Sequence, residues 1–279
     1  MLGRAYVHSL NSSTVPVGSP ILEISDIELR FGGVVALHDV GFTVTQGHIH
    51  AVIGPNGAGK SSLLNCVSGL YHPQKGKAVL HTGDGAVTHE LTKLPPHRIA
   101  RLGVARSFQN IELFPHLTVL ENLMLGRHTH MKHGVLQSLL WFGPARNQEL
   151  SHRGIVEEVI DLLSLQPFRH KPVGSLAYGI QKRVELGRAL VLQPSLLLLD
   201  EPMAGMNSEE KEDMARYVLD VHELAGVTVI LIEHDMAVVM DISDRVSVLD
   251  FGRLIADGTP DEVKANSAVI EAYLGAEEH

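Results

Sequence analysis

The sequence predicts an α/β fold with a mainly parallel core sheet, an antiparallel β layer beside it and an inserted helical subdomain. Short apolar runs, typical of buried parallel strands, alternate with stretches whose apolar residues follow helical spacing. Two early stretches, residues 21–29 and 34–44, alternate apolar and polar residues instead, and this pattern favours an antiparallel layer. From residue 111 to about residue 153 the pattern is irregular and mostly helical, which indicates an insertion.

The chain divides into a leader and one large domain. Residues 1–20 are expected to be a flexible leader, because they lack the continuous apolar core of a signal peptide. Residues 21–279 form the domain, and about residues 111–178 form its helical subdomain. Beyond the two early strands, we expect strands at residues 49–53, 77–81, 104–108, 196–199, 227–232, 245–249 and 253–256, and helices at residues 60–70, 95–102, 153–165, 180–192 and 209–224. Ser208 is the expected N-cap of the last of these helices.

The composition excludes several classes of protein. A chain of 279 residues with 44% apolar and 20% charged residues is ordinary for a globular protein with a sizeable core. The net charge of −9 gives no general basic surface, so nucleic acid is not expected as a partner. The single cysteine, Cys66, excludes an internal disulfide, and the apolar runs are far shorter than the ~18 residues of a membrane helix.

A glycine-rich stretch at residues 54–61 follows an apolar strand and opens the first expected helix. It fits the phosphate-binding P-loop pattern GxxxxGK[ST], in which glycines let backbone N–H groups cradle phosphate oxygens. Lys60 is expected to reach the β- and γ-phosphates, and the Ser61 hydroxyl to bind Mg²⁺. The sequence therefore predicts a nucleoside triphosphate site. Its residues are Gly54, Pro55, Asn56, Gly57, Ala58, Gly59, Lys60, Ser61 and Ser62.

Acidic residues end a fully apolar strand that is expected to lie beside this loop. Asp200 is placed within reach of Mg²⁺, and Glu201 is placed to polarise the attacking water as a general base. His234 ends the next buried strand at the same edge, where it can hydrogen-bond the γ-phosphate. Gln109 ends another strand and is a candidate for contact with Mg²⁺ or the water. The predicted catalytic residues are Glu201, His234, Gln109 and Lys60, and the predicted metal ligands are Ser61, Gln109 and Asp200.

Two further features leave alternatives open. Phe31, at a strand end upstream of the P-loop, either stacks on a nucleotide base or is a core residue next to a turn. Residues 175–179 are either an ordinary capped turn or a second anion site built from a hydroxyl, backbone N–H groups and a helix N-terminus. A second phosphate-binding turn can act on the nucleotide of a partner protomer. The candidate residues of this turn are Ser175, Ala177, Tyr178 and Gly179.

Together these motifs resemble those of the ATP-binding cassette (ABC) ATPase family, over nearly all of residues 21–275. The matching segments, in chain order, are the P-loop (54–61), the Q-loop (106–109), the signature segment (175–185), Walker B with its catalytic glutamate (196–202), the D-loop (204–207) and the switch histidine segment (232–235). The resemblance implies a P-loop NTPase fold of the ABC-ATPase type, with ATP hydrolysis and with ATP and Mg²⁺ as cofactors. It places Phe31 where the adenine ring stacks.

Finer features are similar to the first ATPase subunit of branched-chain amino acid importers. They are found at residues 30–37, 176–179, 204–207, 232–236 and 272–275. This resemblance implies two ATPase subunits that sandwich two ATP molecules head to tail, each between one P-loop and the opposite signature turn. It also implies transmembrane permease subunits, a second ATPase subunit or a second copy of this chain, and an external solute-binding protein. The expected location is peripheral, on the cytoplasmic face of the cell membrane.

Three residues depart from the general ABC pattern. Ala177 stands where a Ser usually contacts the partner's γ-phosphate, and Ile180 stands where Gln is usual. Asn207 replaces the usual Asp of the D-loop and removes a charge that helps couple the two sites. The rate and symmetry of hydrolysis stay open, but we expect hydrolysis to persist because four residues remain: Lys60, Asp200, Glu201 and His234.

Other functions remain open on the sequence alone. A similar cassette serves exporters of lipid or lipopolysaccharide, importers of urea, amides or aromatic acids, and soluble non-transport ATPases. The soluble class usually carries two cassettes, long coiled coils or basic stretches, which this sequence does not show. The sequence indicates neither which solute is transported nor whether the ATPase subunits form a homodimer or a heterodimer.

Overall fold

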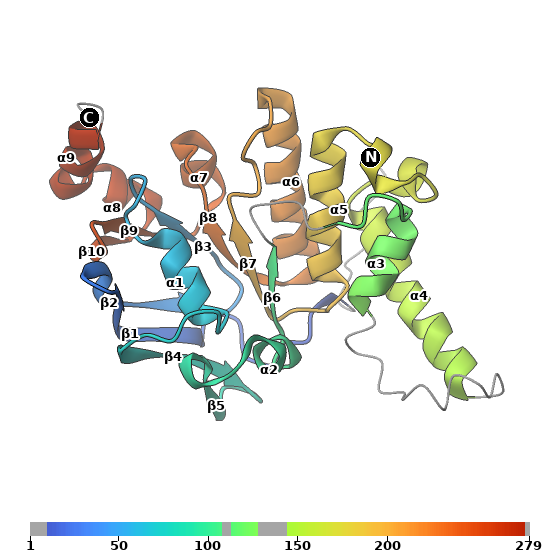
Figure 1. Cartoon of the computed structure of the whole chain (residues 1–279), viewed down its shortest axis with the longest axis horizontal. Coiled ribbons are helices and arrows are strands. Elements are labelled where there is room, and N and C mark those ends of the chain that lie inside the picture. Colours follow the sequence, from blue (N-terminus) through green and yellow to red (C-terminus); the bar gives the residue numbers. More distant parts are fainter. Residues whose placement is uncertain (1–9, 108–112, 128–143, 277–279) are drawn as a thin grey trace.

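The computed structural model describes residues 10–107, 113–127 and 144–276 and shows two β-sheets flanked by helices (Figure 1). The core sheet has six strands in the order β10-β9-β3-β8-β7-β6. Neighbours from β9 to β6 are parallel, and β10 pairs antiparallel with β9 at one edge. The predicted mainly parallel core sheet is confirmed. Its strands are β3 (Ile49–Ile53), β6 (Val104–Ser107), β7 (Leu196–Asp200), β8 (Thr228–Ile232), β9 (Arg245–Asp250) and β10 (Arg253–Gly258).

The second sheet is antiparallel, as predicted, with four strands in the order β2-β1-β4-β5. Figure 1 shows it as a separate layer beneath helix α1. Its strands are β1 (Pro20–Phe31), β2 (Val34–Thr45), β4 (Lys75–Thr82) and β5 (Val87–Glu90). The sequence gives no prediction of β5, because none of its four residues is fully buried and the strand has no apolar face.

Helices connect the strands and close the chain. They are α1 (Lys60–Val67), α2 (Pro96–Arg101), α3 (Val119–Arg127), α4 (Pro144–Leu162), α5 (Tyr178–Leu190), α6 (Ser208–Ala225), α7 (Met236–Ile242), α8 (Pro260–Lys264) and α9 (Ser267–Ala276). Helices α3, α4 and α5 contact one another and lie beyond the β6 end of the core sheet in Figure 1. Helices α3 and α4 fall within the predicted helical subdomain, α5 begins at its last residue, and the boundaries of the subdomain stay a prediction. Among the helices of the described ranges, none is long and apolar enough to cross a membrane.

The N-cap of α6 corrects one prediction. The sequence predicts Ser208 in this position, but the cap is Asn207. The Asn207 side chain accepts a hydrogen bond from the backbone N–H of Glu210 at 2.9 Å, and the Glu210 carboxylate accepts one from the N–H of Asn207 at 3.2 Å. This reciprocal pair satisfies two backbone donors at the start of the helix. Ser208 is therefore the first helical residue.

The central strands of the core sheet are buried along their whole length. Every residue of β3, β7 and β8 is buried, as expected for parallel strands covered on both faces. Side chains that carry chemistry are therefore confined to the ends of these strands. Asp200 is the last residue of β7, and Glu233 directly follows β8.

The second half of the predicted leader lies against the domain. Leu10 is fully buried in the same core cluster as Val229 of β8. The Asn11 side-chain amide donates a hydrogen bond to the Gly226 carbonyl oxygen at 2.6 Å. Residues 1–9 lie outside the described residues, so for them the flexible leader stays a prediction.

A buried polar cluster joins β3, β9 and β10. His50 is fully buried, and its Nε2 donates to the Ser247 hydroxyl at 2.8 Å, which in turn donates to Asp257 Oδ1 at 2.9 Å. Burial lowers the pKa of His50 to about 4; Asp257 acts in the opposite direction, and Arg245 and His48 lower the pKa further. The ring is therefore neutral at physiological pH, and protonation of this side chain opposes folding.

We expect His50→Gln to flatten the pH dependence of stability between about pH 6.5 and pH 4. The folded protein keeps His50 neutral down to about pH 4, whereas the unfolded chain binds the proton near pH 6.5. The unfolded state therefore holds more protons in this window, and the wild-type protein loses up to about 3 kcal/mol of stability as pH falls through it. Chemical unfolding measured at several pH values checks this. His97→Gln, at an exposed position of α2, is the control and should follow the wild-type curve; a His50→Gln curve parallel to it contradicts the assignment.

Candidate functional site

The loop between β3 and α1 is packed tightly against neighbouring backbone. Gly54 has φ 147°, and a Cβ atom there would lie 2.0 Å from the Leu249 carbonyl oxygen. Gly59 has φ 102°, and a Cβ atom there would lie 2.6 Å from the Ala36 carbonyl oxygen. Both positions therefore require glycine for two reasons, the left-handed backbone and the missing side chain. The predicted P-loop has a shape that its glycines make possible.

Lys60 lies inside this loop. Its side-chain nitrogen donates to the carbonyl oxygens of Gly54 at 2.7 Å and Pro55 at 3.0 Å, and the residue is 6% exposed. Burial lowers the pKa of Lys60, whereas the nearby carboxylates of Glu201 and Asp200 raise it. The loop thus encloses an ammonium group whose charge is balanced by the two acidic residues that follow one another at the end of β7.

The C-terminal helix α9 reaches the same loop. Tyr273 is half-buried and packs against the core cluster that contains Ile53, the residue before Gly54. Burial raises the pKa of Tyr273 to about 12, while a hydrogen bond with the backbone of Gly54 acts in the opposite direction. The end of the chain therefore supports the start of the phosphate loop, a contact that the sequence analysis does not predict.

Ser61 and Asp200 bring two oxygen ligands together. Ser61 lies in the first turn of α1, and Asp200 is 3% exposed at the end of β7. The Ser61 hydroxyl lies 3.4 Å from Asp200 Oδ1, and Asp200 Oδ2 accepts a hydrogen bond from Arg106 at 2.8 Å. Hydroxyl and carboxylate oxygens are ligands that Mg²⁺ prefers, together with phosphate oxygens. The two side chains fit the predicted metal site.

Glu201 and His234 meet at this edge of the sheet. His234 Nε2 lies 2.5 Å from Glu201 Oε1, and because a carboxylate only accepts, Nε2 carries the proton. Glu201 has φ 51°, a conformation that costs a non-glycine residue about 1–3 kcal/mol. Its backbone N–H donates to the Ile232 carbonyl at 2.9 Å, which holds this conformation against β8. The side chains of Glu201 and His234 are 15% and 42% exposed, so solvent reaches both.

Glu233 stabilises the backbone around this pair, and this role is not predicted from the sequence. One carboxylate oxygen accepts a hydrogen bond from the backbone N–H of Met203 at 2.8 Å, and the other accepts one from the N–H of His234 at 3.1 Å. Burial raises the pKa of Glu233, and these two hydrogen bonds act in the opposite direction. Glu233 therefore joins the segments that follow β7 and β8. Its position directly before His234, at the end of an apolar strand, is the signal that could have indicated it.

The second candidate turn begins α5 and contacts the segment after Glu201. The Ser175 hydroxyl donates to the Pro172 carbonyl at 2.7 Å, and Ala177 is the N-cap of α5 without a side-chain cap. The Tyr178 hydroxyl donates to the Ala204 carbonyl at 3.1 Å. In Figure 1 the start of α5 lies far from α1, beyond β7 and β6. The described part of the chain does not bring the P-loop and this turn into one site.

A Cβ atom at Gly179 would lie 2.7 Å from Glu210 Oε1, so α5 and α6 approach closely at this turn.

Phe31 is 46% exposed at the end of β1, and its ring packs edge-on against Tyr71 with centroids 5.1 Å apart. Phe31 is therefore not a core residue, and its contact with a base stays a prediction. Gln109 lies outside the described residues.

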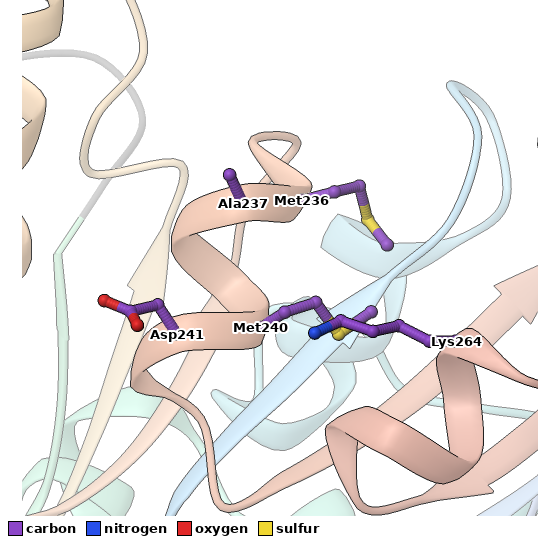
Figure 2. A pocket seen from close by; sticks show the side chains of 5 residues that line it. All are labelled: Met236, Ala237, Met240, Asp241 and Lys264. Atoms are coloured by element: carbon purple, nitrogen blue, oxygen red, sulfur yellow. The ribbon is translucent and has the colours of Figure 1, made fainter.

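A cavity of about 360 Å³ lies beside α7, the helix that follows His234. It is lined by Met236, Ala237, Met240, Asp241 and Lys264 (Figure 2). The figure shows the two methionine side chains on the side of α7 that faces Lys264 of α8. None of the five residues that line this cavity is among the predicted nucleotide-binding residues.

Comparison with known proteins identifies the family. The model of the family described as ABC transporter matches residues 37–204, and that described as branched-chain amino acid ATP-binding cassette transporter matches residues 253–279. The chain is 41% identical over 256 residues to the high-affinity branched-chain amino acid transport ATP-binding protein BraF of Pseudomonas aeruginosa, covering 92% of this chain and 98% of the relative. It is 38% identical over 262 residues to LivG of Escherichia coli, which carries the same description, covering 93% and 99%.

Solved structures agree with this result. An ATP-binding cassette of an ABC transporter in its ADP conformation matches with a TM-score of 0.78 at 30% identity, over 92% of this chain and 99% of that one. A nucleotide-free cassette matches with a TM-score of 0.76 at 29% identity, over 91% and 98%. The chain belongs to the ABC transporter family, as an ATP-binding cassette with the ATPase fold. The ATPase activity and the fold type that the sequence predicts are confirmed.

We expect Gly54→Ala to abolish nucleotide binding and to lower the melting temperature, because the new methyl group meets a backbone carbonyl that cannot move aside cheaply. The measurements are thermal unfolding and titration with a fluorescent ATP analogue. Gly85→Ala is the control: its φ of 83° is also positive and strained for alanine, but no atom lies within 4 Å of the added Cβ. The control should lose about 1 kcal/mol of stability and keep nucleotide binding. Full binding by Gly54→Ala would contradict the tight packing of the loop.

Proposed function

We propose that this chain is the ATP-hydrolysing subunit of an importer for branched-chain amino acids. The observation that carries the proposal is the match to BraF and LivG over more than nine-tenths of the chain, together with the branched-chain amino acid transporter model at residues 253–279. The names of both relatives state branched-chain amino acid transport. The direction of transport follows from the resemblance in the sequence rather than from these names.

Mg²⁺–ATP is the proposed substrate form. Lys60 and the backbone N–H groups of the loop bind the phosphates, and the positive end of α1 favours the same negative charge. Ser61 and Asp200 would hold Mg²⁺, because their oxygens lie 3.4 Å apart and are ligand types that Mg²⁺ prefers. When bound there, Mg²⁺ would neutralise the negative charge that develops on the phosphate oxygens.

Glu201 is the proposed general base. It directly follows Asp200 at the end of β7, its side chain is partly accessible to solvent, and its carboxylate takes a proton from the attacking water. His234 holds this carboxylate through the 2.5 Å hydrogen bond from its Nε2–H, and the same N–H is the proposed donor to the γ-phosphate when nucleotide is bound. Glu233 is buried and holds the segments that carry Met203 and His234 together, because its carboxylate accepts a hydrogen bond from the backbone N–H of each.

The turn at residues 175–179 is proposed to act on the nucleotide of a second ATPase subunit, either a related chain or a second copy. Its distance from α1 in Figure 1 supports a role in trans. Ala177 offers no hydroxyl, so the backbone N–H groups at the start of α5 supply the donors. Asn207 is occupied as the N-cap of α6, where Asn and Asp are equally effective, so its replacement of Asp preserves the cap and removes the charge.

The remaining partners follow from the importer assignment. Transmembrane permease subunits place the chain on the cytoplasmic face of the cell membrane, and a solute-binding protein delivers the amino acid from outside. The net charge of −9 supports the absence of nucleic acid from this set.

Glu201→Gln is expected to reduce ATP turnover by about 100-fold or more while nucleotide binding is retained, because the amide cannot take the proton from water. Phosphate release and titration with a fluorescent ATP analogue measure the two properties. Glu209→Gln is the matched control, since Glu209 is exposed at the start of α6. Turnover of Glu201→Gln equal to that of the control removes Glu201 from the role of base.

Deletion of the encoding gene is expected to abolish uptake of radiolabelled leucine at low external concentration. A plasmid with the wild-type chain should restore uptake, and one with Glu201→Gln should not. Affinity purification of the tagged chain from membranes in mild detergent should recover permease subunits and a second cassette subunit. Normal leucine uptake in the deletion strain contradicts the solute assignment, and recovery of soluble partners alone contradicts the transport assignment.

A further inference from the structure

Arg106 is a largely buried arginine whose side chain contacts residues beside the predicted metal site. It is the third residue of β6, the edge strand of the core sheet, and its side chain is 10% exposed. In the parallel pairing of β6 with β7, Arg106 lies opposite Leu198, two residues before Asp200. Its long side chain therefore extends along the sheet to the end of β7, where the site is.

The guanidinium group contacts two elements of the site at once. One terminal nitrogen donates to Asp200 Oδ2 at 2.8 Å. The other donates to Asn65 Oδ1 at 2.6 Å and to the Ser68 hydroxyl at 3.0 Å. The planar group thus bridges the end of β7 and helix α1, using geometry that a lysine cannot reproduce.

The face of α1 that Arg106 contacts also carries Ser61. Asn65 and Ser68 lie four and seven residues after Ser61, a spacing that places all three side chains on one side of a helix. Asp200 Oδ1 lies 3.4 Å from the Ser61 hydroxyl, while its Oδ2 is held by Arg106. The two oxygen ligands are therefore fixed relative to each other through one guanidinium group.

We propose that Arg106 is the positioning residue of the metal–nucleotide site, which sets the separation of the Ser61 and Asp200 oxygens. This inference rests on the proposed function, because it assumes that the two oxygens bind Mg²⁺. The role is one of positioning rather than catalysis, because Arg106 acts through Asp200 and α1. Because Arg106 belongs to β6, a displacement of this strand would change the metal site through the same side chain.

An alternative role for Arg106 is purely structural. The ion pair with Asp200 joins two neighbouring strands, and loss of one partner leaves a buried charge uncompensated, which destabilises a protein. A structural role changes the stability of the chain and leaves the metal dependence of nucleotide binding unaltered. A positioning role changes the metal dependence in variants that remain folded.

The experiment compares Arg106→Met, Arg106→Lys and Asn65→Ala with Arg101→Met, a matched control at an exposed arginine of α2. Each variant is first checked by circular dichroism. Binding of a fluorescent ATP analogue is then measured in EDTA, and the Mg²⁺ concentration at half-maximal thermal stabilisation is measured at saturating ATP. The electron paramagnetic resonance spectrum of Mn²⁺ with ATP reports the ligand environment directly.

We expect Arg106→Met to raise the half-maximal Mg²⁺ concentration by about 10-fold or more, as is typical when a group that orients a metal ligand is removed. Arg106→Lys should show an intermediate shift, and Asn65→Ala a shift of a few-fold in the same direction. ATP binding in EDTA should stay within about 2-fold of wild type, since the phosphate loop is unchanged. Arg101→Met should match wild type in every measurement.

A folded Arg106→Met with an unchanged Mg²⁺ midpoint and an unchanged Mn²⁺ spectrum overturns the inference. If Arg106→Met does not fold, Arg106→Lys and Asn65→Ala decide in the same way, because both keep part of the network. A wild-type chain that binds ATP equally with and without Mg²⁺ overturns the metal assignment in the proposed function, and the inference with it. The two failures are therefore distinguishable.

Discussion

The parallel pairing of β3, β8 and β7 is the constraint on which the site depends. These three strands are adjacent in the sheet and fully buried, so none of their interior residues offers a polar group to a ligand. Parallel strands end at the same edge, which places the loop after β3, the acidic pair after Leu199 and His234 after β8 side by side. Residues separated by more than a hundred positions in the sequence are therefore close together, and short side chains are enough to bring them into contact.

Several residues at the same edge of the sheet are in energetically unfavourable environments or conformations. Lys60 is buried, Glu233 is buried with a raised pKa, and Glu201 adopts a left-handed backbone conformation. Each is compensated by specific partners, namely loop carbonyls for Lys60, two backbone N–H groups for Glu233 and the Ile232 carbonyl for Glu201. Strain and buried charge of this kind are typical of functional sites, because the surrounding structure has to over-determine them.

The sequence predicts those parts of the molecule whose signals are local. The P-loop and the buried strands β3 and β7 have their full pattern within about ten residues, so their limits agree closely with the structure. Helix α7 has only seven residues, too few for an apolar period, and β5 has no buried face, so neither is predicted. For α6, Asn207 and Ser208 are both good caps, and the reciprocal partner Glu210 three residues after Asn207 is the signal that selects the first.

Such local patterns do not predict contacts between segments that are distant in the sequence. Arg106 is visible in the sequence as part of a strand-end motif, but Asp200 lies 94 residues away and Asn65 lies 41 residues away. Only the order of strands in the sheet places β6 beside β7 and brings the guanidinium group to both. β6 also contacts α5 of the helical group formed by α3, α4 and α5, whereas its Arg106 holds Asp200 beside the phosphate loop. One strand therefore contacts both regions, through its packing against α5 and through the hydrogen bond from Arg106 to Asp200.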